Sequence, residues 1–138
     1  MDFDQISELE TQLVFLLNLD GWQLTKCRDV FSIFDAYGYD TNGQRCIVEF
    51  KFRQEYYDTK MLENKKYQSL INLNYAKKYY CVIDSAGAFM FDLSNIDKSD
   101  FHIIDLPKKT ITDKPEKKQK EIYFLKNDDA IAYNYKFF

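Results

Sequence analysis

The sequence predicts a fold of the α/β or α+β class. We expect one domain over residues 1–138, with a central mixed β-sheet flanked by helices. Three observations predict it. The chain opens on a helical apolar pattern, a group of strand-like runs follows, and a second helical stretch separates that group from further strand-like runs. A chain of 138 residues is long enough to bury a core of its own.

The first element is expected to be a helix that ends at Asp20-Gly21. Either Asp2 with Gln5 or Ser7 with Glu10 supplies a capping box at its start. Glycine just past the last turn is the usual helix terminator. The apolar residues recur at spacings of three and four, the period of one helical face: Ile6, Leu9, Leu13, Leu16 and Leu17.

Strand-like runs occupy the next part of the chain. Residues 22–34 suit an extended segment, and residues 34–39 and 45–53 flank Asp40-Thr41-Asn42-Gly43, a sequence typical of a tight turn. The run at 45–53 alternates, so that three charged side chains share one face of the strand and call for a chemical explanation. One face holds Cys46, Val48, Phe50 and Phe52, and the other holds Ile47, Glu49, Lys51 and Arg53.

The second half of the chain is expected to begin with a helix at about 59–74. Residues 79–84 and 88–93 flank Ser85-Ala86-Gly87 and predict a hairpin. Further strands are expected at 101–106, 121–125 and 130–137. Residues 108–120 contain six lysines and are expected to form an exposed loop, with a DNA-gripping arm as the alternative.

The formal net charge of −3 conceals blocks of opposite sign. Residues 1–44 contain eight acidic and two basic residues, whereas residues 45–78 contain four acidic and eight basic ones. Phosphate groups respond to the local distribution of charge, so the basic middle block keeps a nucleic-acid partner open.

Several classes of protein are excluded. No apolar run reaches the ~20 residues of a membrane span, and the acidic start Met1-Asp2-Phe3-Asp4 does not suit a secretory signal, so a cytoplasmic protein is expected. The three cysteines lack a Cys-x-x-Cys pair and fit reduced thiols. No glycine-rich phosphate loop is present, and His102 has no metal-ligating neighbours at the usual spacing.

The candidate catalytic residues are Asp35 and the tripeptide Glu49-Phe50-Lys51. Alternation places Glu49 and Lys51 roughly 7 Å apart on one strand face, and the preceding hairpin brings Asp35 alongside them. Two carboxylates with a nearby backbone carbonyl suit a hard divalent cation, and a lysine beside the cation positions or deprotonates a water. These groups are sufficient, in principle, to bind a divalent cation and activate a water for phosphodiester hydrolysis.

These residues resemble the PD-(D/E)XK nuclease superfamily, most closely the archaeal-type Holliday junction resolvases and related phage proteins. The resemblance spans Glu8 to Leu73, about half of the chain. In that family a helical glutamate precedes a Gly-aromatic pair, and here Glu10 stands eleven positions before Gly21-Trp22. On a helical wheel Glu10 borders the apolar face of the first helix, so the wheel selects the same residue.

The resemblance implies a restriction-endonuclease-like fold and Mg²⁺- or Mn²⁺-dependent cleavage of DNA. Asp35 and Glu49 would bind the metal with the Phe50 carbonyl, Glu10 would bind it directly or through water, and Lys51 would orient the attacking water. Junction or other branched DNA is the implied substrate and a homodimer the implied assembly. The second helix would direct Lys66 to the scissile phosphate, within a DNA-binding track of Arg53, Lys60, Lys65, Lys77 and Lys78.

Each assignment has a structural alternative. Asp35 can instead cap a turn through its side chain. Glu49 and Lys51 can instead form an ion pair on a solvated sheet face. Lys66 suits a side chain that extends past leucines to water. Tyr56-Tyr57 suits either packing or stacking on an unpaired base. For the whole chain, the alternative is a catalytically silent module of the same fold that binds a protein or DNA.

Overall fold

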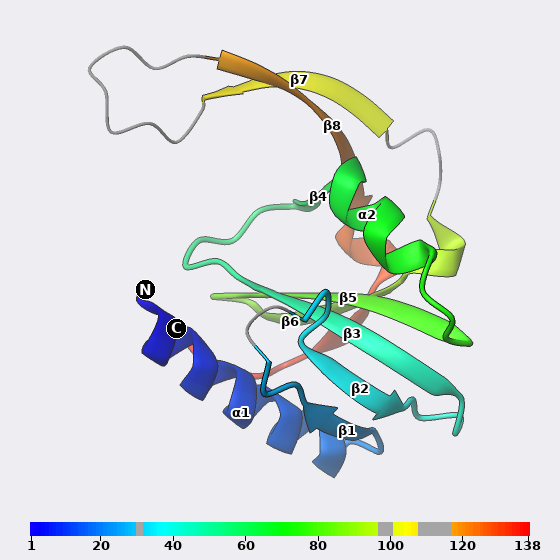
Figure 1. Ribbon diagram of the computed structural model, residues 1–138. Coiled ribbons are helices and arrows are strands. Elements are labelled where there is room, and N and C mark those ends of the chain that lie inside the picture. The colour runs from blue at the N-terminus through cyan, green and yellow to red at the C-terminus, as the bar shows by residue number, and fades with distance from the viewer. Residues whose placement is uncertain (30–31, 97–100, 108–116) are drawn as a thin grey trace.

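The computed structural model describes residues 1–29, 32–96, 101–107 and 117–138 (Figure 1). The chain forms a six-stranded mixed sheet, two α-helices and a separate three-stranded sheet. The six-stranded sheet consists of β1 (Gln23–Lys26), β2 (Ala36–Tyr39), β3 (Arg45–Phe52), β5 (Lys77–Asp84), β6 (Gly87–Asp92) and β9 (Ile131–Tyr133), in the order β1-β2-β3-β5-β6-β9. Only the β3–β5 pair is parallel among these described strands.

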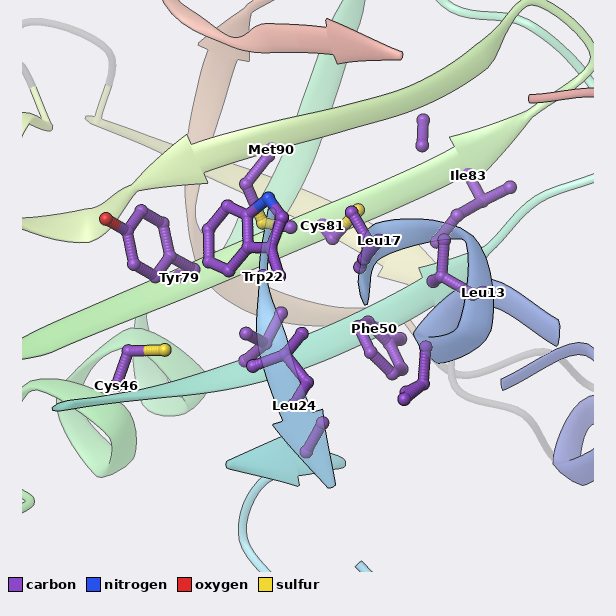
Figure 2. Close-up of a cluster of buried hydrophobic side chains, with 14 residues drawn as sticks. Leu13, Leu17, Trp22, Leu24, Cys46, Phe50, Tyr79, Cys81, Ile83 and Met90 are labelled. Carbon is purple, nitrogen blue, oxygen red and sulfur yellow. The ribbon is translucent and has the colours of Figure 1, made fainter. Parts of the chain in front are cut away.

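Helix α1 (Phe3–Leu19) covers one face of this sheet (Figure 1). Of the two expected capping boxes, the one formed by Asp2 and Gln5 is present. Leu13 and Leu17 are fully buried among side chains of β3, β5 and β6, with Trp22 beside them, in the core cluster of Figure 2. The residues that follow β9 cover the same face, and the Phe137 ring contacts the Phe52 ring there.

The opposite face of the six-stranded sheet carries a second core. It is covered by α2 (Asn64–Ile71) and by a three-stranded sheet of order β4-β8-β7, formed by β4 (Thr59–Glu63), β8 (Lys117–Lys126) and β7 (Phe101–Pro107). Ile47, Val82 and Phe91 from the large sheet meet Leu62 and Leu70 here. Two short 3₁₀ turns, η1 (Leu93–Asn95) and η3 (Asn127–Asp129), complete the described elements.

The two hairpins expected from the sequence are confirmed. Strands β2 and β3 pair antiparallel around Asn42-Gly43, and β5 and β6 pair antiparallel around Ser85-Ala86. The alternation of β3 is also confirmed, because Cys46, Val48 and Phe50 lie in the α1-side core while Ile47 lies in the other. The predicted α/β class with a mixed sheet flanked by helices is therefore correct.

Four element boundaries differ from expectation. The helix expected at 59–74 is the strand β4 followed by the shorter α2, because Lys60 and Leu62 alternate inward and β4 pairs with the distant β8. Within residues 22–34 the described strand covers only Gln23–Lys26, and within 130–137 only Ile131–Tyr133. Of the loop expected at 108–120, residues 117–120 belong to β8 and residues 108–116 lie outside the described part.

No helix in the described part of the chain has the length and apolar character needed to cross a membrane.

Candidate functional site

A cleft of about 480 Å³ opens where α1, the end of β3, β4 and α2 meet. Its walls include all four residues predicted to be catalytic, the Phe50 that follows Glu49, and two of the basic residues predicted to contact DNA. These lining residues are Glu10, Asp35, Glu49, Phe50, Lys51, Arg53 and Lys66. Residues from four separate segments of the chain thus share one cavity.

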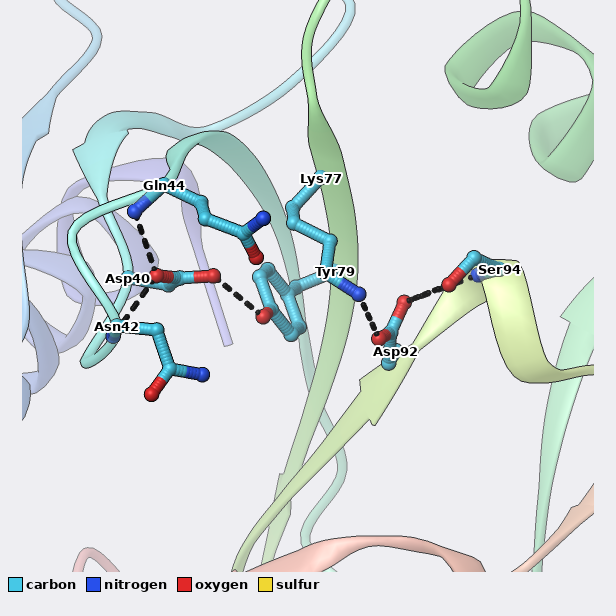
Figure 3. A network of polar contacts seen from close by, with 7 residues as sticks. All are labelled: Asp40, Asn42, Gln44, Lys77, Tyr79, Asp92 and Ser94. Atoms are coloured by element: carbon cyan, nitrogen blue, oxygen red, sulfur yellow. Dashed lines mark hydrogen bonds and ion pairs between the residues drawn. The ribbon is translucent and has the colours of Figure 1, made fainter.

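The register of the β2–β3 hairpin depends on its turn (Figure 3). The buried Asp40 carboxylate accepts hydrogen bonds from the backbone N–H groups of Asn42 and Gln44, each at 2.9 Å, and from the Tyr79 hydroxyl at 2.9 Å. Gly43 adopts a φ of 76°, which favours glycine at this position. Because the turn is tied to β5 through Tyr79, β2 and β3 are fixed relative to each other and Asp35 has a defined place beside β3.

Asp35 stands immediately before β2 and is held through its backbone and its side chain. Its N–H donates to the Val48 carbonyl at 3.0 Å, and its own carbonyl accepts from the Cys27 N–H at 2.8 Å. One carboxylate oxygen, Oδ2, accepts from the Phe50 N–H at 2.8 Å. The N–H and C=O of a strand residue point to the same side, so the Phe50 carbonyl faces the Asp35 side of β3.

Glu10 and Asp35 form a coupled pair of acids. The side chain of Glu10 reaches Asp35 from α1, and the two carboxyl groups are joined by a hydrogen bond. Burial, the negative charge of Asp35 and this hydrogen bond raise the pKa of Glu10 to about 7, against a weaker opposing effect of Lys26. Burial also raises the pKa of Asp35, although its bonds from Phe50 and Glu10 oppose that rise. The pair therefore retains a proton near neutral pH.

Glu49 has a different neutralising partner. Its side chain is only 11% exposed, and its Oε2 forms an ion pair with Lys66 Nζ from α2. The same ammonium donates to the Ile33 carbonyl at 2.9 Å. Burial lowers the pKa of Lys66, and the negative charge of Asp35 opposes that effect. Lys66 therefore faces the site, as the sequence predicts, and its contact there is with Glu49.

Lys51 and Arg53 continue along the same face of β3. Lys51 is exposed at the cleft. Arg53 follows the strand, and its N–H donates to the Ile83 carbonyl of β5 at 2.8 Å, which fixes the backbone where the chain leaves the sheet. The two cations therefore line the cleft beyond Glu49.

The other predicted DNA contacts lie elsewhere, and for Lys60 the assignment is corrected. Lys60 is 1% exposed and forms an ion pair with buried Asp84 at 2.7 Å, so it is a core residue. Lys77 pairs with Asp92 at 2.6 Å at the start of β5, the opposite end of the sheet from the cleft. Lys78 follows Lys77 on β5, and Lys65 is exposed on α2; neither lines the cleft.

The tyrosine pair that precedes β4 has a mixed environment. The Tyr56 ring covers Lys60, with Nζ 4.5 Å from the ring centroid, and its hydroxyl accepts from Asn127. Tyr56 and Tyr57 remain 46% and 52% exposed. Packing therefore accounts for one face of Tyr56, in agreement with the structural alternative for that residue.

Sequence reasoning missed the contribution of β4 to the cleft. Met61, Leu62 and Glu63 of β4 line it together with Tyr80 from β5. Glu63 also pairs with Lys120 of β8 at 2.8 Å. The available signal was the alternation of Thr59, Met61 and Glu63 with Lys60 and Leu62, which has the period of a strand.

The donor set suits a hard divalent ion. Asp35 and Glu49 offer carboxylate oxygens, and Glu10 and the Phe50 carbonyl add oxygen donors on the same side of β3. In the described residues no three acidic, histidine or cysteine side chains are already gathered as a metal-binding cluster. Mg²⁺ commonly binds through one or two carboxylates and keeps several waters, which two carboxylates in an open cleft permit.

Comparison with known proteins supports the fold. No protein-family model matches the sequence, and no curated protein matches it. Among solved structures, the chain is similar to Hjc, a Holliday junction resolvase from the archaeal hyperthermophile Archaeoglobus fulgidus, with a TM-score of 0.52. The match covers 87% of this chain and 89% of that chain at 17% sequence identity. The two chains thus share a fold.

Proposed function

We propose that this protein is a divalent-metal-dependent DNA endonuclease, with a four-way or otherwise branched DNA junction as its favoured substrate. The observation that carries the proposal is the meeting of Glu10, Asp35, Glu49 and Lys51 in one cleft. The similarity in fold to a Holliday junction resolvase supports the substrate class. Neither a turn cap nor a solvated ion pair explains why Asp35 and Glu49 also share that cleft with a glutamate from α1.

The acidic residues have distinct tasks in this proposal. Asp35 and Glu49 hold Mg²⁺ or Mn²⁺ with the Phe50 carbonyl, and Glu10 contributes directly or through a bound water. When bound, such an ion supplies positive charge for the scissile phosphate and lowers the pKa of a coordinated water. The bond from the Phe50 N–H holds Asp35 Oδ2 at 2.8 Å, so that carboxylate keeps one orientation beside β3.

The basic residues act on the phosphate and on water. Lys51 lies two residues after Glu49 on the same strand face, where its ammonium orients the attacking water and offsets developing negative charge. Arg53 continues that line of positive charge and contacts a flanking phosphate. Because the chain carries a net charge of −3, we expect DNA binding without metal to be weak and sensitive to salt.

Junction resolution also implies an assembly. Two matched cuts in a symmetric four-way junction require two sites related by a two-fold axis, so we propose a homodimer. Light scattering with and without junction DNA tests this part separately. A monomer under both conditions would remove the resolvase subtype and leave the endonuclease proposal in place.

The test uses four-way junction, flap and supercoiled plasmid DNA incubated with the protein in Mg²⁺ or Mn²⁺. We expect cleavage with a preference for the junction, and a loss of at least about 100-fold in rate for Lys51→Ala. Lys136→Ala is the matched control, because Lys136 is exposed near the chain end and does not line the cleft. Equal cleavage by the wild type and Lys51→Ala would refute the proposal.

A further inference from the structure

Lys66 spans the candidate site from α2 and contacts two other segments. Its ammonium pairs with Glu49 on β3 and donates to the Ile33 carbonyl, just before Asp35, at 2.9 Å. Glu49 is nearly enclosed, with 11% of its side chain exposed, whereas 39% of the Lys66 side chain is exposed. The contact therefore satisfies a buried acid through a side chain that still has access to solvent.

The partners of this ammonium are of the kind that a divalent ion uses. A carboxylate oxygen and a backbone carbonyl oxygen are hard donors that bind Mg²⁺ and ammonium groups alike. A carboxylate as enclosed as Glu49 is costly without a compensating cation. Lys66 supplies that cation, while the neighbouring Glu10–Asp35 pair is compensated by its shared hydrogen bond and raised pKa values.

We infer that Lys66 is a displaceable internal cation, which neutralises Glu49 in the metal-free protein and leaves it when a divalent ion binds. The released ammonium turns toward the cleft, which Lys66 also lines, and becomes available to a phosphate of the bound DNA. This inference rests on the proposed function and adds regulation to it. Lys66 opposes metal binding in the absence of DNA and supports DNA binding once the metal is present.

Lys66 and the metal compete for Glu49, and this competition determines how much Lys66 weakens metal binding. If the ion pair is formed about 90% of the time, only a tenth of the molecules present Glu49 to the metal, and the apparent metal affinity falls about tenfold. Removal of Lys66 should therefore tighten metal binding by about tenfold. Removal of a nearby lysine that does not contact Glu49 should change it by no more than about twofold, the effect of general charge screening.

Titration calorimetry in the absence of DNA measures the affinity of each protein for Mn²⁺. The proteins are wild type, Lys66→Met, Lys66→Gln and Lys65→Met, with Asp35→Asn to identify heat that arises at the site. Lys65 is the matched control, because it neighbours Lys66 on α2 but is exposed and does not line the cleft. Lys66→Gln keeps a donor for the Ile33 carbonyl and guards against a misfolded methionine variant.

A second readout uses the wild-type protein and requires no variant. Reductive methylation with mass spectrometry measures how accessible each lysine is. We expect Mn²⁺ to speed the methylation of Lys66 by at least about fivefold and to leave Lys65 unchanged, because Lys66 loses its partner.

The outcomes separate the inference from the proposed function. Tighter Mn²⁺ binding by both Lys66 variants, with Lys65→Met like the wild type, supports the inference. If Asp35→Asn abolishes Mn²⁺ binding but the Lys66 variants bind no more tightly, or if saturating Mn²⁺ does not speed the methylation of Lys66, the inference is overturned and the metal site stands. If the wild type shows no Asp35-dependent Mn²⁺ binding, the proposed function itself fails.

Discussion

Replacement of Glu10 by glutamine should stabilise the metal-free protein at alkaline pH. In the folded chain Glu10 lies against Asp35, and burial with this neighbouring charge raises the pKa of Glu10 from 4.5 to about 7. The folded protein therefore holds this proton more tightly than the unfolded chain does. Consequently the free energy of unfolding falls as the pH rises from about 4.5 through about 7, and the loss is complete above that range.

The size of this effect follows from the two pKa values. A rise from 4.5 to about 7 corresponds to at most about 3.4 kcal/mol. Because Glu10 is only partly buried, solvent screening reduces the figure to about 1–2 kcal/mol. Glutamine stays neutral at every pH and still offers an N–H to Asp35, so Glu10→Gln should lack most of this loss.

Urea denaturation at pH 5 and at pH 8.5, with chelator present, measures the difference. Wild type should lose about 1–2 kcal/mol more than Glu10→Gln between the two pH values. Glu8→Gln is the matched control, because Glu8 is exposed on the same helix and does not line the cleft. Parallel pH profiles for wild type and Glu10→Gln would refute the description of Glu10 and Asp35 as a proton-sharing pair.

Three further predictions concern the scaffold. Lys60→Met should lower the free energy of unfolding by about 3–5 kcal/mol, because it leaves Asp84 buried without its 2.7 Å partner; Asp84→Asn added to it should recover part of the loss, and no recovery in denaturant titrations would contradict this explanation. Gly38→Ala should cost about 2–4 kcal/mol, because φ is 151° and a Cβ would lie 1.9 Å from the Gln23 carbonyl oxygen; an unchanged thermal midpoint would be inconsistent with this geometry. Alkylation of the native protein should modify Cys27 first, because Cys27 is only partly buried whereas Cys46 and Cys81 are fully buried, and burial raises the pKa of all three thiols; faster labelling of Cys81 would contradict that packing.

Local signals in the sequence were sufficient for the elements that build the site. The apolar period of α1 and its Asp2–Gln5 cap are short-range features, as are the Asn42-Gly43 turn and the alternation of β3. Each is determined by residues within about ten positions of one another. The helical wheel and the family resemblance both select Glu10, which the structure places beside Asp35.

Long-range pairing explains the failures. The sequence predicts a helix where β4 lies, because the strand partner β8 is some 60 residues away, with Lys60 opposite Leu125. For the same reason the sequence predicts Lys60 on a DNA-binding surface, since nothing near it in the sequence indicates an ion pair with Asp84. The Lys66–Glu49 contact is also non-local, because it joins α2 to β3 across the intervening β4.

The most direct test of the central claim is the single-turnover rate of phosphodiester cleavage in a four-way DNA junction at saturating Mg²⁺. The wild-type protein should cleave the junction, and Asp35→Asn should reduce the rate by at least about 100-fold while the Lys136→Ala control matches the wild type. Cleavage by Asp35→Asn at the wild-type rate would contradict the claim that the cleft shared by Glu10, Asp35, Glu49 and Lys51 is a hydrolytic metal site.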